Sequence, residues 1–132
     1  MIPKNSEEAI RMGLRDIEDK FGISFLKIAD GEAESEAPLL SKHRNFYNMP
    51  YGAVLFNLAD NTAGMAYLST GGNGVTVSGN VNYLRGAAPE VKSARCRAKV
   101  IKRGRKLCFI EARVEDDQGN LLSTYNFVYS DI

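Results

Sequence analysis

The chain of 132 residues has the usual length of one domain, and we expect residues 1–132 to fold as a single unit. Hydrophobic residues make up 44% and charged residues 25%, which is typical of a globular protein and excludes a disordered chain. Seventeen basic and sixteen acidic residues leave a net charge of +1, which argues against nucleic acid or a membrane surface as a partner.

The residue types also exclude several common sites. One histidine and two cysteines are too few for a standard zinc site, so we expect no metal. The sequence has no P-loop motif and no nucleophile–histidine–acid series around His43. Because the first residues lack the apolar region of a signal peptide, we expect a cytoplasmic protein.

Residues 6–20 are predicted to form an amphipathic helix, since apolar residues recur at spacings of three and four. These residues are Ile10, Leu14, Ile17 and Phe21. Asn5 suits the N-cap of this helix, and Gly22 suits a left-handed stop at its end.

A β-hairpin is predicted for residues 23–38, because two strand-like runs flank the turn dipeptide Asp30-Gly31. In the second run, acidic residues alternate with small ones. The acidic residues are Glu32, Glu34 and Glu36. Three like charges on one strand face predict that this face is exposed to solvent.

Residues 51–70 form the one predicted helix that is apolar on nearly all sides, which indicates a buried helix. Asn48 is a good N-cap and Pro50 suits a first turn, so we expect the helix to begin near residue 49 or 50. A glycine-rich cluster at residues 71–74 is expected to end it.

The last third reads as four consecutive strands, and we expect an antiparallel meander wrapped around the buried helix, an α+β fold. The predicted strands are residues 75–84, 91–102, 106–115 and 121–130. The apolar residues of the second and third of these strands have even numbers, from Ala94 to Val100 and from Cys108 to Val114. They lie on one face of the sheet only if residues opposite each other have numbers with an even sum. This predicts a three-residue loop at 103–105, or an equivalent bulge, with Arg97 opposite Glu111 and Cys96 opposite Ala112.

Two features of the buried helix point to chemistry. The amide of Gly52 in its first turn lacks a helical acceptor and can polarise a carbonyl oxygen. Asp60, two turns further on, has no basic residue one turn away and is expected to be buried. Either Asp60 is a functional carboxylate, or it is a structural one that is hydrogen-bonded to Asn57, Asn61 or a strand hydroxyl.

Asn45, Tyr51-Gly52-Ala53 and Asp60 follow one another in an order and at spacings that resemble the hotdog-fold acyl-CoA thioesterases, and above all the phenylacetate-pathway (PaaI-like) branch. That pattern has an asparagine, a His-Gly-Gly six residues later and an aspartate nine residues after the histidine. The matching segments are Asn45, Tyr51-Gly52-Ala53, Leu58-Ala59-Asp60, Gly74-Val75-Thr76-Val77 and Asn82-Tyr83-Leu84-Arg85. Both spacings are kept, and the resemblance covers residues 23–130, although Tyr51 stands where the pattern has histidine.

The resemblance implies a hotdog fold, an antiparallel sheet around a central helix, with an additional N-terminal helix here. It implies hydrolysis of an acyl-CoA, with aryl-CoAs among the candidates, to the free acid and coenzyme A. Asp60 would be the general base or nucleophile, and the Gly52 amide would polarise the thioester carbonyl. Asn45 would hold the water or the thioester, and Thr76 would position the water. The site would lie across the interface of a homodimer or a dimer of dimers.

Further residues are candidates for binding the substrate. Tyr51 and Asn48 occupy positions at which the family pattern has other residues. The basic candidates for the phosphates of coenzyme A are Arg85, Arg103, Arg105 and Lys106. The last three belong to a basic cluster that, taken alone, favours a solvated hairpin tip. We expect no cofactor, since coenzyme A is part of the substrate.

Two alternatives stay open. Because Tyr51 replaces the histidine, the chain could be a non-catalytic hotdog domain that binds an acyl-CoA or an aromatic acid. A hotdog dehydratase would need an aspartate and a histidine together, and His43 falls on another element. The alternating aromatic residues Tyr125, Phe127 and Tyr129 are interpreted as core or subunit interface and not as ligand contacts.

Overall fold

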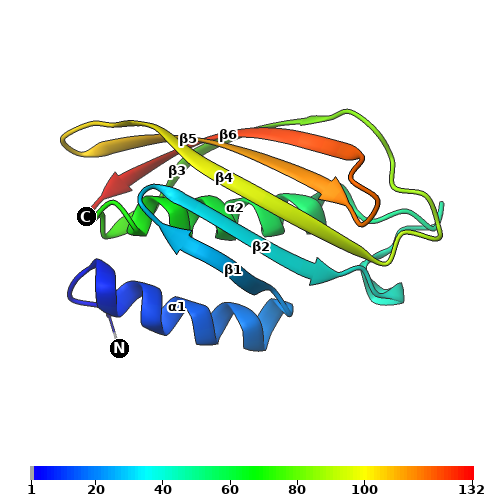
Figure 1. Cartoon of the computed structure of the whole chain (residues 1–132), viewed down its shortest axis with the longest axis horizontal. Helices are drawn as coiled ribbons and strands as arrows, with labels where there is room; N and C mark the ends of the chain where they lie inside the picture. Colours follow the sequence, from blue (N-terminus) through cyan, green and yellow to red (C-terminus); the bar gives the residue numbers. More distant parts are fainter. Residues whose placement is uncertain (1) are drawn as a thin grey trace.

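Six strands form one antiparallel sheet that packs against a central helix, with a second helix at the N-terminal end of the chain (Figure 1). This is a computed structural model, and it describes residues 2–132, so Met1 falls outside the described residues. In chain order the elements are α1 (Ser6–Phe21), β1 (Ser24–Ala29), β2 (Glu32–Pro38), the 3-10 helix η1 (Ser41–His43), α2 (Gly52–Leu68), β3 (Gly74–Tyr83), β4 (Ser93–Arg103), β5 (Leu107–Asp116) and β6 (Leu121–Asp131). The predicted α+β arrangement is confirmed.

Local signals define the first two elements as predicted. The side chain of Asn5 accepts a hydrogen bond from the Glu8 amide at 2.9 Å and caps α1. Gly22 has a φ of 68°, the left-handed conformation that ends the helix. Asp30 and Gly31 have φ angles of 53° and 78°, as a two-residue hairpin turn between β1 and β2 requires.

The predicted meander of four consecutive strands is wrong at its first member. The strand order is β1-β2-β4-β5-β6-β3, so β3 pairs with β6 and not with β4. Residues 84–92 carry the chain from β3 at one edge back to β4 in the middle. Ala87 and Val91 anchor this crossing in the core, where they are 3% and 1% exposed. The crossing leaves β3 as an edge strand beside α2.

The register of β4 and β5 keeps the predicted even sum but not the predicted pairs. Arg97 lies opposite Arg113 and Cys96 opposite Val114, each two residues from the expected partner. The register shifts at Ile101, which is an extra residue in β4. This bulge is the expected equivalent of a three-residue loop, and it keeps the apolar sets of both strands on the inner face.

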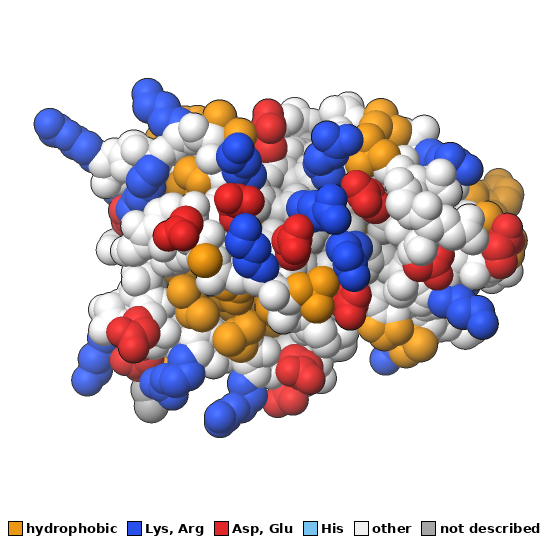
Figure 2. All heavy atoms as spheres, viewed as in Figure 1, with side chains coloured by type: hydrophobic (Ala, Val, Ile, Leu, Met, Phe, Trp, Pro, Cys, Tyr) orange, Lys and Arg blue, Asp and Glu red, His pale blue; other side chains and the backbone are white. Residues whose placement is uncertain are grey.

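The outer face of the sheet carries charges that neutralise one another. Glu34 forms an ion pair with Arg97 at 3.0 Å, and Glu36 forms one with Arg95 at 3.2 Å. Figure 2 shows acidic and basic side chains interspersed over the face of the molecule seen there. The acidic face predicted for β2 is therefore paired with β4, and such exposed pairs contribute at most about 1 kcal/mol each.

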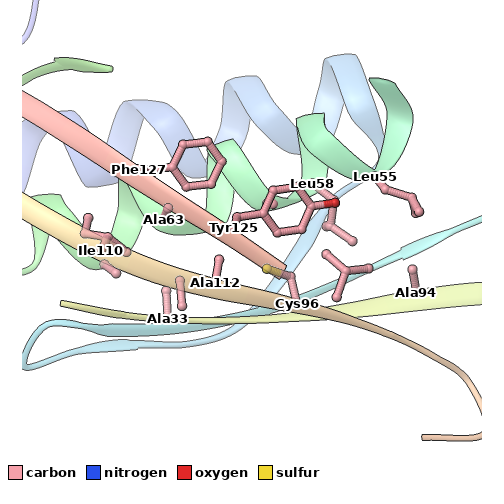
Figure 3. Close-up of a cluster of buried hydrophobic side chains, with 14 of the residues drawn as sticks. Ala33, Leu55, Leu58, Ala63, Ala94, Cys96, Ile110, Ala112, Tyr125 and Phe127 are labelled. Carbon is pink, nitrogen blue, oxygen red and sulfur yellow. The ribbon is translucent and has the colours of Figure 1, made fainter. Parts of the chain in front are cut away.

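The core lies between α2 and the inner face of the sheet. Eight residues of α2 are buried: Leu55, Leu58, Ala59, Thr62, Ala63, Met65, Ala66 and Tyr67. Figure 3 shows Tyr125 and Phe127 of β6 lying between α2 and the strands, as the alternation of aromatic residues predicts. Cys96 and Cys108 are fully buried among these side chains. Within residues 2–132, no helix combines the length and the apolar character that crossing a bilayer requires.

Candidate active site

The loop before α2 places the helix start later than predicted. The helix begins at Gly52 with Tyr51 as its N-cap, and not at residue 49 or 50. Asn48 is not the N-cap: its φ of 59° is left-handed, and its amide bonds to the Asn45 carbonyl at 2.9 Å. The Tyr51 amide bonds instead to the His43 carbonyl at 2.9 Å, which holds the loop closed until Gly52.

Asn45 organises this loop. Its side-chain oxygen accepts hydrogen bonds from the amides of Tyr47 at 2.9 Å and Met49 at 3.2 Å. Its side-chain amino group bonds to no acceptor within residues 2–132, so that group remains available to a ligand. Asn45 therefore has a structural task beside any role in binding.

Gly52 lies at the exposed start of α2. The amides of Val54 and Leu55 both bond to the Tyr51 carbonyl, so the Gly52 amide is one of those left without a helical acceptor. The ring of Tyr83 covers this glycine, and its hydroxyl donates to the Gly52 carbonyl at 2.7 Å. A Cβ at position 52 would lie 2.8 Å from the Tyr83 ring, so only glycine fits without a shift.

Asp60 is partly exposed, which corrects the expectation of a buried carboxylate. The hydroxyl of Thr76 donates to its Oδ1 at 2.9 Å. The hydroxyl of Tyr129 lies 2.7 Å from the same Oδ1 and 2.5 Å from the Asp60 carbonyl oxygen. The sequence left Asn57, Asn61 or a strand hydroxyl as hydrogen-bond partners of Asp60. Strand hydroxyls make these bonds, whereas the side chains of Asn57 and Asn61 bond to each other at 2.9 Å.

The carboxylate borders a hollow of about 290 Å³ between α1, α2 and β3. The lining residues are Gly13, Ile17, Asp60, Asn61, Gly64, Met65, Leu68, Gly74, Val75, Thr76 and Tyr129. Asp60 is the one acidic or basic residue among them. Because no described residue donates to its Oδ2, that oxygen is free to accept a proton from a bound water or to contact a ligand.

Tyr129 was missed as a site residue from the sequence. The alternation of aromatic residues predicts core or subunit interface for it, and its ring is buried at 4% exposure. Burial, and then the neighbouring carboxylate of Asp60, raise the pKa of the Tyr129 hydroxyl, which therefore stays protonated and acts as a donor. A buried tyrosine needs a hydrogen-bond partner for its hydroxyl. This requirement was the one signal in the sequence that could have indicated a polar contact for Tyr129.

The predicted catalytic residues fall into two groups within one protomer. Asp60 and Thr76 touch, while Asn45 and Gly52 lie at the start of α2. Gly52 and Asp60 are eight positions apart in the helix, which is about 12 Å along the axis. One thioester carbonyl cannot contact both at once inside a single chain.

The predicted substrate-binding residues are spread over several elements. Tyr51 is 48% exposed next to Gly52. Arg85 is exposed and donates to the Asn120 side chain at 3.2 Å. Arg105 and Lys106 are exposed at the β4–β5 turn.

Arg103 differs from its neighbours in the predicted basic set. Its guanidinium pairs with Asp131 at 2.6 Å and lies over the ring of Tyr67 at 5.6 Å. Tyr67 also donates to Asp131, at 2.5 Å. Arg103 is thus engaged inside the protein, unlike Arg105 and Lys106.

We predict that Asp131→Asn lowers the free energy of unfolding by about 1–2 kcal/mol at pH 7, because two donors lose a charged acceptor. The hydrogen bond from Tyr67, and then Arg103, lower the pKa of Asp131 below its ordinary 3.8. The stabilisation is therefore complete above about pH 5 and is lost as the pH falls through the lowered pKa. Urea unfolding at pH 7 and pH 3 measures the difference.

Asp16→Asn is the control for this prediction, since Asp16 forms an exposed pair with Lys20 at 2.9 Å. This change should leave the free energy of unfolding within about 0.5 kcal/mol of the unaltered protein. A loss in Asp131→Asn that is equal at the two pH values would contradict the assignment to the carboxylate.

Comparison with known proteins identifies the family. Residues 47–123 match the thioesterase superfamily, and the chain belongs to it. The predicted hotdog fold and the predicted enzyme class, a thioesterase, are those of this superfamily. A search of the curated proteins gave no match.

Solved structures share the fold over nearly the whole chain. A conserved protein of Pseudomonas aeruginosa is 28% identical, with a TM-score of 0.82 over 92% of this chain and 98% of that one. A hypothetical thioesterase of Streptococcus pneumoniae with coenzyme A is 20% identical, with a TM-score of 0.80 over 93% and 94%. The PaaI protein of the E. coli phenylacetic acid degradation operon is 16% identical, with a TM-score of 0.84 over 95% and 97%.

Two further solved structures are variants of the streptococcal protein, and each is 21% identical to this chain. One solved variant has an aspartate replaced by alanine, and another has a threonine sixteen positions further along replaced by alanine. No group of three His, Cys, Asp or Glu side chains within residues 2–132 is arranged to hold a metal ion.

Proposed function

We propose that the protein hydrolyses the thioester bond of an acyl-CoA to a free acid and coenzyme A, with Asp60 as the reacting carboxylate. The observation that carries this proposal is the arrangement at Asp60. Two hydroxyls hold its Oδ1, no described residue donates to its Oδ2, and the residue lines an open hollow. A carboxylate oriented in this way can act on a water or on a carbonyl carbon.

As a general base, Asp60 takes a proton from a water whose oxygen attacks the thioester carbon. The carbonyl oxygen becomes negative and is stabilised by the Gly52 amide at the positive end of α2. Collapse of this intermediate breaks the C–S bond, and the departing thiolate of coenzyme A takes the proton from Asp60. In the nucleophilic variant, Asp60 attacks the carbon itself, the C–S bond breaks, and the thiolate of coenzyme A leaves and is protonated from water. A water molecule then hydrolyses the mixed anhydride to the free acid and returns the Asp60 carboxylate.

Thr76 keeps Asp60 in place in this proposal. Its proton is used in the bond to Oδ1, so its oxygen can still accept a hydrogen bond from the attacking water. The uncommitted amino group of Asn45 would hold the thioester oxygen or the water on the other side of the substrate. Tyr51, beside Gly52, would contact the acyl group or donate a hydrogen bond to it.

The separation of about 12 Å between Gly52 and Asp60 calls for a second copy of the chain. β3 is a sheet edge, and it exposes Val75 and Val77, each 55% exposed. Pairing of two β3 strands would cover both edges and bring Asp60 of one protomer toward the Gly52 of the other. We propose a homodimer that contains two shared sites.

The phosphates of coenzyme A would be bound by exposed basic residues. Arg105 and Lys106 at the β4–β5 turn are exposed, and Arg85 is exposed with one hydrogen bond to the neutral Asn120 side chain, whereas Arg103 is paired with Asp131. The streptococcal protein of the same fold was solved with coenzyme A, which supports this class of substrate.

The test is release of free thiol from a panel of aryl and aliphatic acyl-CoAs, with the same acyl groups on pantetheine as matched substrates. We expect turnover of at least one acyl-CoA and a KM about tenfold higher for its pantetheine thioester, which lacks the nucleotide phosphates. Failure to hydrolyse any member of the panel would rule out the proposed function.

A second candidate function, binding without hydrolysis, is favoured by Tyr51 at the position of the family histidine. A tyrosine hydroxyl donates a hydrogen bond but is not a base at neutral pH. Calorimetric binding of an acyl-CoA that is recovered intact would support this function over the first.

A further inference from the structure

We propose that Tyr129 is a positioning residue for the carboxylate of Asp60. Its hydroxyl holds Oδ1 by a hydrogen bond, so that Oδ2 is the oxygen presented to the substrate. The inference rests on the proposed function, since Asp60 is the reacting group there. It assigns a role to a residue that the sequence pattern placed in the core.

The first step is the geometry at Asp60. The Tyr129 hydroxyl lies 2.7 Å from Oδ1 and 2.5 Å from the carbonyl oxygen of the same residue. Its single proton is therefore directed at one residue whichever acceptor it serves. Since Thr76 also donates to Oδ1, rotation of the Asp60 side chain about χ1 would break the bond from Thr76 and, when Tyr129 donates to Oδ1, a second bond to the charged group.

The second step is how two strands bring both donors to one oxygen. Thr76 and Tyr129 are direct cross-strand partners in the β3–β6 pair, so their side chains lie on the same face. The register shifts immediately after Thr76, and Val77 is the extra residue. Such a bulge redirects the neighbouring side chain, which here reaches α2.

The third step is what holds the Tyr129 ring. It stacks on the ring of Tyr67, with centroids 5.1 Å apart and an angle of 20° between the planes. Tyr67 is held in turn by its hydrogen bond to Asp131, and Asp131 by Arg103. The sequence made Arg103 a candidate for binding the substrate. In the structure it instead acts on the site indirectly, through Asp131 and Tyr67, which hold the Tyr129 ring.

The surroundings leave Asp60 dependent on these hydroxyls. α1 contributes Gly13 and Ile17 to the hollow, and neither bears a charge. The residues that α2 and β3 contribute are also uncharged apart from Asp60 itself. Orientation of the carboxylate is therefore left to Thr76 and Tyr129, because no ion pair within the described hollow shares the task.

The test compares Tyr129→Phe with Tyr125→Phe. Both changes remove one buried hydroxyl from the same face of β6, but the Tyr125 hydroxyl bonds to Ser123 at 2.7 Å and does not touch Asp60. In Tyr129→Phe we expect kcat for the best acyl-CoA to fall about tenfold while KM stays within about twofold. In Tyr125→Phe both constants should stay within about twofold.

A second readout does not need activity. Three-bond NMR couplings report the χ1 rotamer of Asp60, which we expect to be single in the unaltered protein and in Tyr125→Phe, and averaged in Tyr129→Phe. A single rotamer in Tyr129→Phe, or a loss of kcat no greater than in Tyr125→Phe, would overturn the inference. If the unaltered protein hydrolyses no acyl-CoA, the proposed function fails, and the rotamers still decide whether Tyr129 positions Asp60.

Discussion

Asp60→Asn is expected to lower kcat for acyl-CoA hydrolysis about a thousandfold, because an amide can neither take a proton from water nor attack the carbonyl carbon. The amide oxygen can still accept the hydrogen bonds that Thr76 and Tyr129 donate to Oδ1. We therefore expect little change in thermal stability and a KM within a fewfold of the original. Thiol release under single-turnover and steady-state conditions measures the loss.

The matched control is Asp19→Asn, which makes the same chemical change on the exposed surface of α1. It should leave kcat within about twofold. If Asp60→Asn kept turnover within about tenfold of the unaltered protein, Asp60 would not be the reacting carboxylate, and the binding-only function would gain support.

The second large effect concerns the sharing of the site between protomers. Gly52→Ala places a methyl group 2.8 Å from the Tyr83 ring, so the start of α2 or the ring must move. Misplacing the amide that faces the carbonyl oxygen is expected to cost about a hundredfold in kcat. Asp60→Asn and Gly52→Ala homodimers should both be nearly inactive.

A heterodimer of these two variants has a different expected result. If each site takes Asp60 from one chain and Gly52 from the other, one of the two sites contains both original residues, and activity returns to about half per dimer. Co-expression with two affinity tags isolates the heterodimer, and thiol release measures its activity. A heterodimer as inactive as its parents would place the whole site in one chain, and a monomer in solution would refute the proposed dimer.

Local sequence accounted well for the elements whose signals are local. Asn5 and Gly22 bracket α1 because a cap and a left-handed stop depend only on adjacent residues. The apolar character of residues 51–70 was enough to predict a central helix, since burial of such a helix has few solutions. Gly52 was a candidate because of its place in the first helical turn, and Asp60 because it interrupts an apolar helix. The spacings from Asn45 to Tyr51 and from Tyr51 to Asp60 indicated the family, and family membership agrees with them.

The start of α2 shows where local reasoning was insufficient. Asn48 and Pro50 are good helix-start residues by preference, yet the chain closes a loop there through the bond from the Tyr51 amide to the His43 carbonyl. A backbone bond between residues eight positions apart outweighed an intrinsic preference of about 1 kcal/mol. The helix start moved accordingly to Gly52.

What the sequence alone determined is therefore the set of elements and the two candidate positions on α2. The partners of those positions depended on the order of the strands. Pairing of β3 with β6 brings Thr76 and Tyr129 to one carboxylate oxygen, although 53 residues separate them in the chain. Hydrogen bonds between such distant residues follow from how the sheet is assembled around the helix, and neither spacing nor periodicity encodes that assembly.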